Sequence, residues 1–411
     1  MNISIRRLKY YLQPGKSMKR IGIDARLLLR PLRGMPLYIT RLCQYLPALN
    51  RNYTYFLFIN RGFEHNAKPD NYQHVLNEMA EKNSNVNIIN CDDDAEVLWE
   101  QVYLPRLVKK HKIDLLLMPA NRTCFFPGVP TIVTLHDVME YLYLKEEYLR
   151  GPKTVHADIK TSLYKARMDA YIWASYKFGF KRATRIITVS QYSASDIANY
   201  LKISKDNITA IHHGIDNEFI CNSVDSPYGF NLRTHVLMLG GDSHHKNPEG
   251  AIAAWSNVPK NIRNKYPLKV IGFCGGTNST LIQALKKYNL EKEVEVNGWV
   301  SQEALIDYLR KAVLFLYLSR YEGFGFPILQ AMASGTPVIS TDKSSIPEVL
   351  GETGFKFDPE DHTSIAAGIE KLVLDRTLWA DQSVSGITRA NMFTWKTSAE
   401  KHLEVFNEIL R

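Results

Sequence analysis

The sequence of 411 residues contains no apolar run of the roughly 18 residues that a membrane-spanning helix needs. Its first residues include Arg6, Arg7 and Lys9 without a continuous apolar segment behind them, so a cleaved signal peptide is not expected. The five cysteines are odd in number and scattered, and no Cys-x-x-Cys pair occurs. A disulfide framework and a structural zinc site are therefore both disfavoured, and a reducing cytoplasm is the simplest compartment.

Signature motifs of several enzyme classes are missing as well. No Gly-x-Gly-x-x-Gly follows a predicted strand, although such a motif marks the dinucleotide-binding folds. The chain also lacks the Gly-x-Ser-x-Gly turn of serine hydrolases and the phosphate-binding P-loop. Nicotinamide or flavin chemistry and P-loop nucleotide hydrolysis are therefore not expected.

The charge of the chain is unbalanced, with 51 Lys and Arg against 42 Asp and Glu and a formal net charge of +9. This excess favours anionic partners such as phosphorylated substrates, a membrane surface or nucleic acid. Basic residues concentrate in residues 6–41 and 145–185, and the second segment interleaves them with aromatic residues. That segment fits either a solvated helix face or a face that docks on an anionic membrane or an acceptor. Without a recognised nucleic-acid module, nucleic acid is not an expected partner.

Short apolar runs alternate with helical patterns along the first half of the chain. Helices are expected at Leu37–Leu46, where Pro47 stops the helix, at Val97–Lys112, and around Thr161–Phe180. Near-continuous apolar strands that alternate with helices indicate a mostly parallel sheet covered on both faces. The predicted strands of this half are Ile21–Ala25, Tyr53–Asn60, Val86–Asn90, Asp114–Pro119, Thr131–Asp137 and Arg185–Ser190, and Ile208–Ile215 closes it.

The same alternation restarts in the second half of the chain. Strands are predicted at His235–Gly241, Leu268–Gly272, Val294–Trp299, Ala312–Ser319, Pro337–Thr341 and Gly354–Phe357. Helices fit the segment after Pro248 and the ranges Ser279–Tyr288, Gln302–Lys311, Pro327–Ser334, Ser364–Leu374 and Trp395–Leu410.

Two tandem doubly wound α/β domains are therefore predicted, facing each other across a cleft at the carboxyl ends of their strands. Residues 1–17 lack the pattern and are expected to form a tail. The first domain takes residues 18–216, the linker residues 217–233, and the second domain residues 234–393. Residues 394–411 are predicted to form a C-terminal helix that packs back on the first domain.

The stretch Ser319–Ser340 is the strongest candidate for a functional site. A glycine-spaced turn, Gly323–Gly325, follows an apolar strand, and Pro327 suits the first position of a helix. A helix that opens on free backbone N–H groups beside a glycine loop is suited to bind an anion such as phosphate. The carboxylate of Glu322 can accept hydrogen bonds from ligand hydroxyls. Alone, however, the stretch is also consistent with an ordinary strand–turn–helix unit.

Three further positions follow predicted strands, where ligand sites gather in such sheets. Lys246 comes after the glycines Gly240 and Gly241 and can neutralise a diphosphate. His136 ends the apolar strand of the first half, and Gly34 lies after the first strand. A surface lysine, a structural histidine and a loop glycine would explain the same residues without any function.

The acidic run Asp92–Asp94 is a candidate metal site, because paired aspartates after a strand can hold a divalent ion. Acidic residues that lead into a helix also suit the positive end of the helix dipole. The second explanation is preferred, so neither a metal ion nor a cofactor is predicted.

Between Glu322 and Val338 the sequence resembles glycosyltransferase family 4, which has the GT-B fold of two Rossmann-like domains. The resemblance extends from Ile21 to the end of the chain, because many short motifs stand in the family's order. These motifs are Ile21–Arg26 followed by Gly34, Trp99–Gln101, Thr134–Asp137, Ile187–Ser190, His213–Asp216, Lys246–Asn247, Asn297–Val300, Ile346–Glu348 and Phe357–Pro359.

The resemblance implies a retaining, metal-independent hexosyltransferase that uses a nucleotide-diphosphate sugar. It assigns catalytic roles to Glu322, which holds the hydroxyls of the donor sugar, to Lys246, which neutralises the leaving diphosphate, and to His136, which helps to position the sugar. It implies that the donor is bound by Gly34, Gly241, His245, Lys246, Val300, Glu322, Gly323, Phe324, Gly325, Phe326 and Gln330.

Two departures from the family's pattern concern nucleotide binding. Gln330 stands where the family has a second glutamate, which holds the ribose. The family's arginine near the lysine is also missing, since Gly241 stands five residues before Lys246. His245, if protonated, is the candidate to replace part of that charge.

The predicted function is extension of a surface saccharide, such as an O-antigen or capsule precursor, on a saccharide or lipid-linked acceptor. The protein is expected to be cytoplasmic and peripheral at the inner face of the plasma membrane. The alternatives are another GT-B enzyme that acts on nucleotide sugars, such as an epimerase, and an inactive GT-B subunit that binds a partner transferase.

Overall fold

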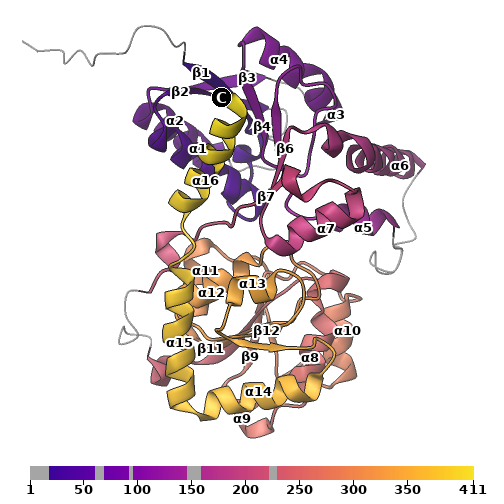
Figure 1. The fold of residues 1–411 in the computed structure, drawn as a ribbon. Helices are drawn as coiled ribbons and strands as arrows, with labels where there is room; N and C mark the ends of the chain where they lie inside the picture. The colour runs from indigo at the N-terminus through magenta and orange to yellow at the C-terminus, as the bar shows by residue number, and fades with distance from the viewer. Residues whose placement is uncertain (1–17, 61–68, 92–95, 146–158, 222–228) are drawn as a thin grey trace, which may run out of the picture.

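A computed structural model describes residues 18–60, 69–91, 96–145, 159–221 and 229–411. It contains two parallel sheets that follow one another along the chain and lie in separate domains (Figure 1). The seven strands of the first sheet have the order β3-β2-β1-β4-β5-β6-β7, and the six of the second have the order β10-β9-β8-β11-β12-β13. Every neighbouring pair is parallel, which confirms the predicted pair of doubly wound α/β domains.

The strands lie close to the predicted ranges. In the first domain they are β1 (Lys19–Asp24), β2 (Tyr53–Asn60), β3 (Val86–Cys91), β4 (Leu115–Met118), β5 (Thr131–Thr134), β6 (Arg185–Thr188) and β7 (Ile208–Ala210). In the second they are β8 (His235–Leu239), β9 (Leu268–Ile271), β10 (Glu295–Val296), β11 (Ala312–Tyr317), β12 (Val338–Thr341) and β13 (Phe355–Phe357).

Helices connect the strands in both domains. The first domain contains α1 (Met35–Leu49), α2 (Pro69–Lys82), α3 (Glu96–Leu98), α4 (Leu104–Lys110), α5 (Met139–Lys145), α6 (Ile159–Ala174) and α7 (Gln191–Leu201). The rest of the chain contains α8 (Pro248–Ser256), α9 (Lys260–Lys265), α10 (Thr280–Lys287), α11 (Gln302–Lys311), α12 (Phe326–Ala333), α13 (Ile346–Leu350), α14 (His362–Leu374), α15 (Arg376–Ala390) and α16 (Trp395–Leu410).

Each sheet has one apolar cluster on each face, because successive side chains of a strand point to opposite sides. In β2, Tyr55 and Leu57 belong to the cluster under α1, whereas Phe56 and Phe58 belong to the opposite cluster. The same alternation divides β11 between the two clusters of the second domain. Burial on both faces explains why these strands have no polar side in the sequence.

Two predicted helices differ from the structure at proline. The first was predicted to stop at Pro47, but α1 continues through it to Leu49, so this prediction is wrong. Pro47 lies in the last turn, where its missing N–H removes only one helical hydrogen bond. The predicted helix Val97–Lys112 is interrupted by a wider π-helical turn at Trp99–Tyr103, immediately before Pro105 in α4. A π turn is one way for a helix to accommodate a proline, which has no backbone N–H to donate to the helical hydrogen bond.

The C-terminal helix α16 leaves the second domain and packs beside α1 of the first (Figure 1). Its side chains Trp395, Leu403 and Phe406 enter the same cluster as the strands of the first sheet. Two chain segments therefore cross between the domains, one after β7 and one between α15 and α16. They touch at Gly214, where a Cβ atom would lie only 2.1 Å from the backbone nitrogen of Trp395.

No helix among the described residues is both long enough and apolar enough to cross a membrane. Residues 1–17, predicted to be a tail, and residues 222–228 of the predicted linker lie outside the described residues.

Candidate active site

The stretch Ser319–Ser340 forms the strand–turn–helix unit that its sequence predicts. It follows β11, turns at the glycines and enters α12, which begins at Phe326, one residue earlier than expected. Gly325 precedes the helix with a φ of 104°, a left-handed conformation that glycine adopts at little energetic cost. The unit therefore ends in eight helical residues, of which Phe326 has a backbone N–H without a partner within the helix, Pro327 has no N–H, and Ile328 donates to the Gly325 carbonyl oxygen at 3.0 Å.

Lys246 and Glu322 meet directly, although 76 residues separate them in the sequence. The Lys246 ammonium donates to Oε1 of Glu322 at 2.7 Å and to the Tyr317 hydroxyl at 2.7 Å. The Tyr317 hydroxyl donates in turn to Glu322 Oε1 at 2.7 Å. The three groups form a closed triangle at the mouth of the glycine turn.

The charges of this triangle stabilise one another. Burial alone lowers the pKa of Lys246, but the nearby Glu322 carboxylate outweighs burial and raises that pKa above its ordinary value. Burial raises the pKa of Glu322, and the Lys246 ammonium more than reverses that effect, so the pKa ends below its usual range. Both groups are therefore charged near neutral pH.

Two serines after β12 hold the turn in place. Ser344 accepts a hydrogen bond from the Glu322 backbone nitrogen at 2.9 Å. Ser345 donates to the carbonyl oxygens of Glu322 at 2.8 Å and Phe324 at 3.0 Å. These serines were missed, because nothing in the local sequence distinguishes them from ordinary loop residues.

The first domain contacts the turn at Gly323. The Ser190 and Ser193 hydroxyls at the start of α7 donate to the Gly323 carbonyl oxygen at 2.7 and 3.1 Å. A Cβ atom on Gly323 would lie 3.0 Å from both the His136 carbonyl oxygen and Oδ2 of Asp137. Two sequence motifs from opposite halves, the His136–Asp137 strand end and the glycine turn, thus come together.

His136 is buried and held in one orientation. Its backbone nitrogen donates to Asn121 Oδ1 at 2.8 Å, and its Nε2 lies 3.3 Å from the Pro119 carbonyl oxygen. A carbonyl can only accept, so Nε2 carries the proton. Burial lowers the pKa of His136 to about 4, so the ring is neutral at pH 7.

Asp137 was not singled out in the sequence as a functional residue. Burial raises its pKa to about 6, with Glu140 and Glu322 adding to the shift and Lys246 opposing it. Its Oδ1 accepts from the Met139 backbone nitrogen at 2.9 Å, at the start of α5. The carboxylate therefore both begins a helix and contacts the candidate site.

His245 is neutral at pH 7, whereas the sequence suggested a charge there. Its ring Nδ1 lies 2.7 Å from the Tyr143 hydroxyl of the first domain. Burial and the neighbouring Lys246 lower the pKa of His245 to about 4. The neutral ring does not favour the hypothesis that His245 replaces the missing arginine by protonation, which stays a prediction. The ring forms an interdomain hydrogen bond.

The remaining predicted residues surround this centre at different distances. Gly34 precedes α1 with a φ of 55°, next to Arg33, whose guanidinium lies 4.0 Å from the ring centre of Trp299 in the second domain. Val300 follows Trp299, so the loops of Gly34 and Val300 face each other across the domains.

Gly241 packs against the Lys246 side chain, where a Cβ atom would lie 3.1 Å from Cγ of the lysine. Phe324 is buried and Phe326 half-buried, and the rings of both contact His213 of the first crossover segment. Gln330 is half-buried on the second turn of α12, one turn beyond the triangle of Lys246, Tyr317 and Glu322.

Among the described residues, no group of three or more histidine, cysteine, aspartate or glutamate side chains could hold a metal ion. The acidic run at 92–94, the only metal site considered in the sequence, lies outside the described residues.

Models of two protein families match the chain, one for each domain. Residues 32–219 match the model described as "Glycosyltransferase Family 4", and residues 231–388 match "Glycosyl transferases group 1". The first model covers the strand end at His136, and the second covers the Lys246–Glu322 pair, so both parts of the candidate site lie within matched residues.

Curated relatives from Escherichia coli include "O-antigen chain mannosyltransferase B", 29% identical over 57% of this chain and 64% of its own length. Another is "Serotype-specific mannosyltransferase WbdA", 25% identical over 68% of this chain. The matched segment thus spans less than two thirds of the first relative and 34% of the second. Among solved structures, HepE of Anabaena in complex with UDP-glucose superposes with a TM-score of 0.65 at 16% identity, covering 95% of this chain and all of that one.

Proposed function

Because the chain belongs to glycosyltransferase family 4, with the GT-B fold, we propose that it transfers a hexose from a nucleotide-diphosphate sugar to a saccharide acceptor with retention of the anomeric configuration. The observation that carries the proposal is the charged triangle of Lys246, Tyr317 and Glu322 at the start of α12. A fixed ammonium, a carboxylate and the backbone N–H of Phe326 at one point match a diphosphate joined to a hydroxylated sugar.

The residues act on the charges that change during transfer. The sugar passes through an oxocarbenium-like state while negative charge grows on the leaving diphosphate. Lys246 and the backbone N–H of Phe326 at the start of α12 oppose that growing charge, and Glu322 accepts hydrogen bonds from the sugar hydroxyls. The neutral His136 of the first domain positions the sugar from the side opposite Glu322 and Lys246, which belong to the second domain.

The acceptor is proposed to be a bacterial surface saccharide, free or lipid-linked. This proposal rests on the O-antigen mannosyltransferases among the relatives, and the nature of the sugar is left open. A cytoplasmic place at the inner face of the plasma membrane is proposed on the same basis and on exposed basic and aromatic residues of α6.

The site assignment is tested by the variants Glu322→Ala and Lys246→Ala in a transfer assay with the native saccharide. Each is expected to lower kcat/KM by about 10²-fold or more, because each removes a charge that acts on the transition state. Glu249→Ala and Lys287→Ala are matched controls, since this exposed ion pair of the same domain joins a glutamate to a lysine. Turnover as high as in the controls would show that the assignment is wrong.

Catalysis without a metal ion is proposed, because Lys246 and the backbone N–H of Phe326 supply the positive charge that metal-dependent transferases take from a cation. Transfer is therefore expected to continue at an unchanged rate in excess EDTA. A loss of activity that manganese restores would contradict this proposal and would direct attention to the acidic run at 92–94.

A further inference from the structure

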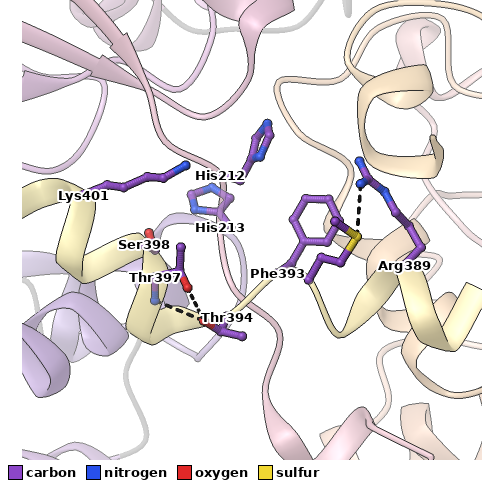
Figure 2. A pocket seen from close by; sticks show the side chains of 9 residues that line it. His212, His213, Arg389, Phe393, Thr394, Thr397, Ser398 and Lys401 are labelled. Atoms are coloured by element: carbon purple, nitrogen blue, oxygen red, sulfur yellow. Dashed lines mark hydrogen bonds between the residues drawn. The ribbon is translucent and has the colours of Figure 1, made fainter.

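A pocket lies where the two crossover segments meet, and its residue His213 also contacts Phe324 and Phe326 of the candidate active site (Figure 2). Its lining comes from the segment after β7, from the end of α15 and from the start of α16. The lining residues are His212, His213, Arg389, Met392, Phe393, Thr394, Thr397, Ser398 and Lys401. They include two permanent cations and several hydroxyl groups but no carboxylate.

Two buried polar atoms of this lining lack hydrogen-bond partners within the described part of the chain. They are Nδ1 of His213, a residue with 3% exposure, and Oγ of Ser398, a residue with 1% exposure. An unsatisfied buried polar atom destabilises the native state, so native proteins satisfy such atoms with water, an ion or a ligand. Two of them in one pocket indicate a polar occupant.

The cations of the pocket are available to that occupant. Lys401 is exposed and reaches from α16 toward His212 (Figure 2). Arg389 donates through Nε and Nη2 to the carbonyl oxygens of Val349 and Glu348, and its Nη1 donates to the weakly accepting sulfur of Met392 at 3.6 Å. Its guanidinium also lies 4.8 Å from the ring centre of Phe393.

The helix α16 adds further donors. Thr397, Ser398 and Lys401 lie on α16, with Lys401 three and four residues beyond the other two, and Thr394 is the extended N-cap residue before the helix. Thr397 and Ser398 belong to the first turn, where the helix dipole favours negative charge. Cations, hydroxyls and a helix N-terminus together select a compact oxyanion.

We propose that this pocket binds inorganic phosphate or the phosphate group of a small metabolite, as a second site distinct from the one that holds the donor. An oxyanion there accepts from Lys401 and from the hydroxyls of Thr397 and Ser398, whereas the Thr394 hydroxyl donates to Thr397 Oγ1 at 2.9 Å. His213 donates when its proton is on Nδ1.

The position of the pocket links its occupant to both domains. His212 and Arg389 both contact Glu348. Nε2 of His212 lies 2.5 Å from the Glu348 carboxylate, and Nη2 of Arg389 donates to the Glu348 carbonyl oxygen at 2.7 Å. That carboxylate also accepts from the backbone nitrogen of Gln191 at the start of α7, in the first domain. A bound phosphate therefore lies against the residues that hold the domains together.

The proposal is tested by thermal unfolding of the full chain in rising inorganic phosphate, with sodium chloride adjusted to keep the ionic strength constant. A ligand that binds only the native state raises the melting temperature. In Lys401→Met, the phosphate concentration needed for the same rise in melting temperature is expected to be at least about 10-fold higher, because a charge-assisted hydrogen bond is lost. Lys396→Met, on the outer face of the same helix, is the matched control and should behave as the wild type.

Two further variants separate this site from the alternatives. Ser398→Ala removes an unsatisfied hydroxyl, so it should leave the melting temperature without phosphate unchanged or higher while reducing the phosphate-dependent shift. Lys246→Met should retain the shift. A shift that Lys246→Met abolishes and Lys401→Met retains would assign the phosphate to the donor site and overturn the proposal. An equal rise in melting temperature in every variant would also overturn the proposal. The absence of any rise in the wild type at tens of millimolar phosphate would overturn it as well.

Discussion

At the scale of single residues, the candidate site depends on close contacts that leave no space for a larger side chain. Gly323 is the clearest case, because its backbone lies against His136 and Asp137 of the other domain while its carbonyl oxygen accepts from two serines. The residue is glycine because any side chain would enter the interdomain contact, and its φ is not in the left-handed region.

Gly323→Ala is therefore expected to lower the free energy of unfolding by about 1–3 kcal/mol, the usual effect of overpacking, and to reduce transfer. Gly276→Ala is the matched control, since a Cβ atom there meets nothing within 4 Å. Urea unfolding and the transfer assay measure the two effects. If both variants proved equally stable, the interdomain contact at Gly323 would not be tight in solution.

At the scale of elements, α6 and the turns after it differ from a simple amphipathic helix. Tyr164, Trp173 and Phe178 are exposed, the last two in edge-to-face contact at 5.7 Å, while Tyr176 is buried. Residues 164–182 contain five basic residues and one acidic residue. Exposed aromatic rings beside positive charge are typical of protein surfaces that bind anionic membranes.

The double variant Trp173→Ser, Phe178→Ser is expected to weaken co-sedimentation with vesicles that contain anionic lipid, since it removes the apolar part of this surface. Binding of the wild type should also fall as salt rises, because salt screens the charges. Leu374→Ser, at a more exposed apolar position at the end of α14, serves as the control. Absence of wild-type binding at low salt would reject the membrane proposal.

At the scale of the whole molecule, buried histidines make stability depend on pH. Burial lowers the pKa of His136, His235, His245 and His402 to about 4. In the unfolded chain these histidines have a pKa near 6.5. Between about pH 6.5 and pH 4 the unfolded chain therefore binds more protons than the native state, which lowers the stability of the native state as the pH falls. Stability contributed by these rings is complete above about pH 6.5 and is lost toward pH 4. Asp137, with a pKa raised to about 6, opposes this trend between about pH 4 and 6.

Unfolding by urea is therefore expected to require less denaturant at pH 5 than at pH 7. In His402→Gln the free energy of unfolding should depend less steeply on pH, by up to about 1.4 kcal/mol per pH unit, because one buried histidine is removed. His402 accepts from Tyr38 at the packing of α16 on α1, at 2.8 Å, and glutamine can still accept that bond. Equal pH slopes in the two proteins would contradict the assignment of His402.

The local sequence predicted most of the fold because its signals are local. The apolar runs predicted the strands of both sheets to within a few residues, except for β7, since a strand buried on both faces needs continuous apolar side chains. The predicted end of α1 at Pro47 was wrong, and the π turn before Pro105 was missed. Both errors arise because tertiary packing can override the helix-breaking tendency of proline.

The sequence by itself thus determined two doubly wound domains, the glycine turn before α12 and the lysine and glutamate proposed to act on the donor. Only the tertiary structure decided that Lys246 meets Glu322 and Tyr317 and that His245 is neutral. Secondary structure follows the period of neighbouring side chains, whereas ion pairing, burial and pKa depend on segments that only folding brings together.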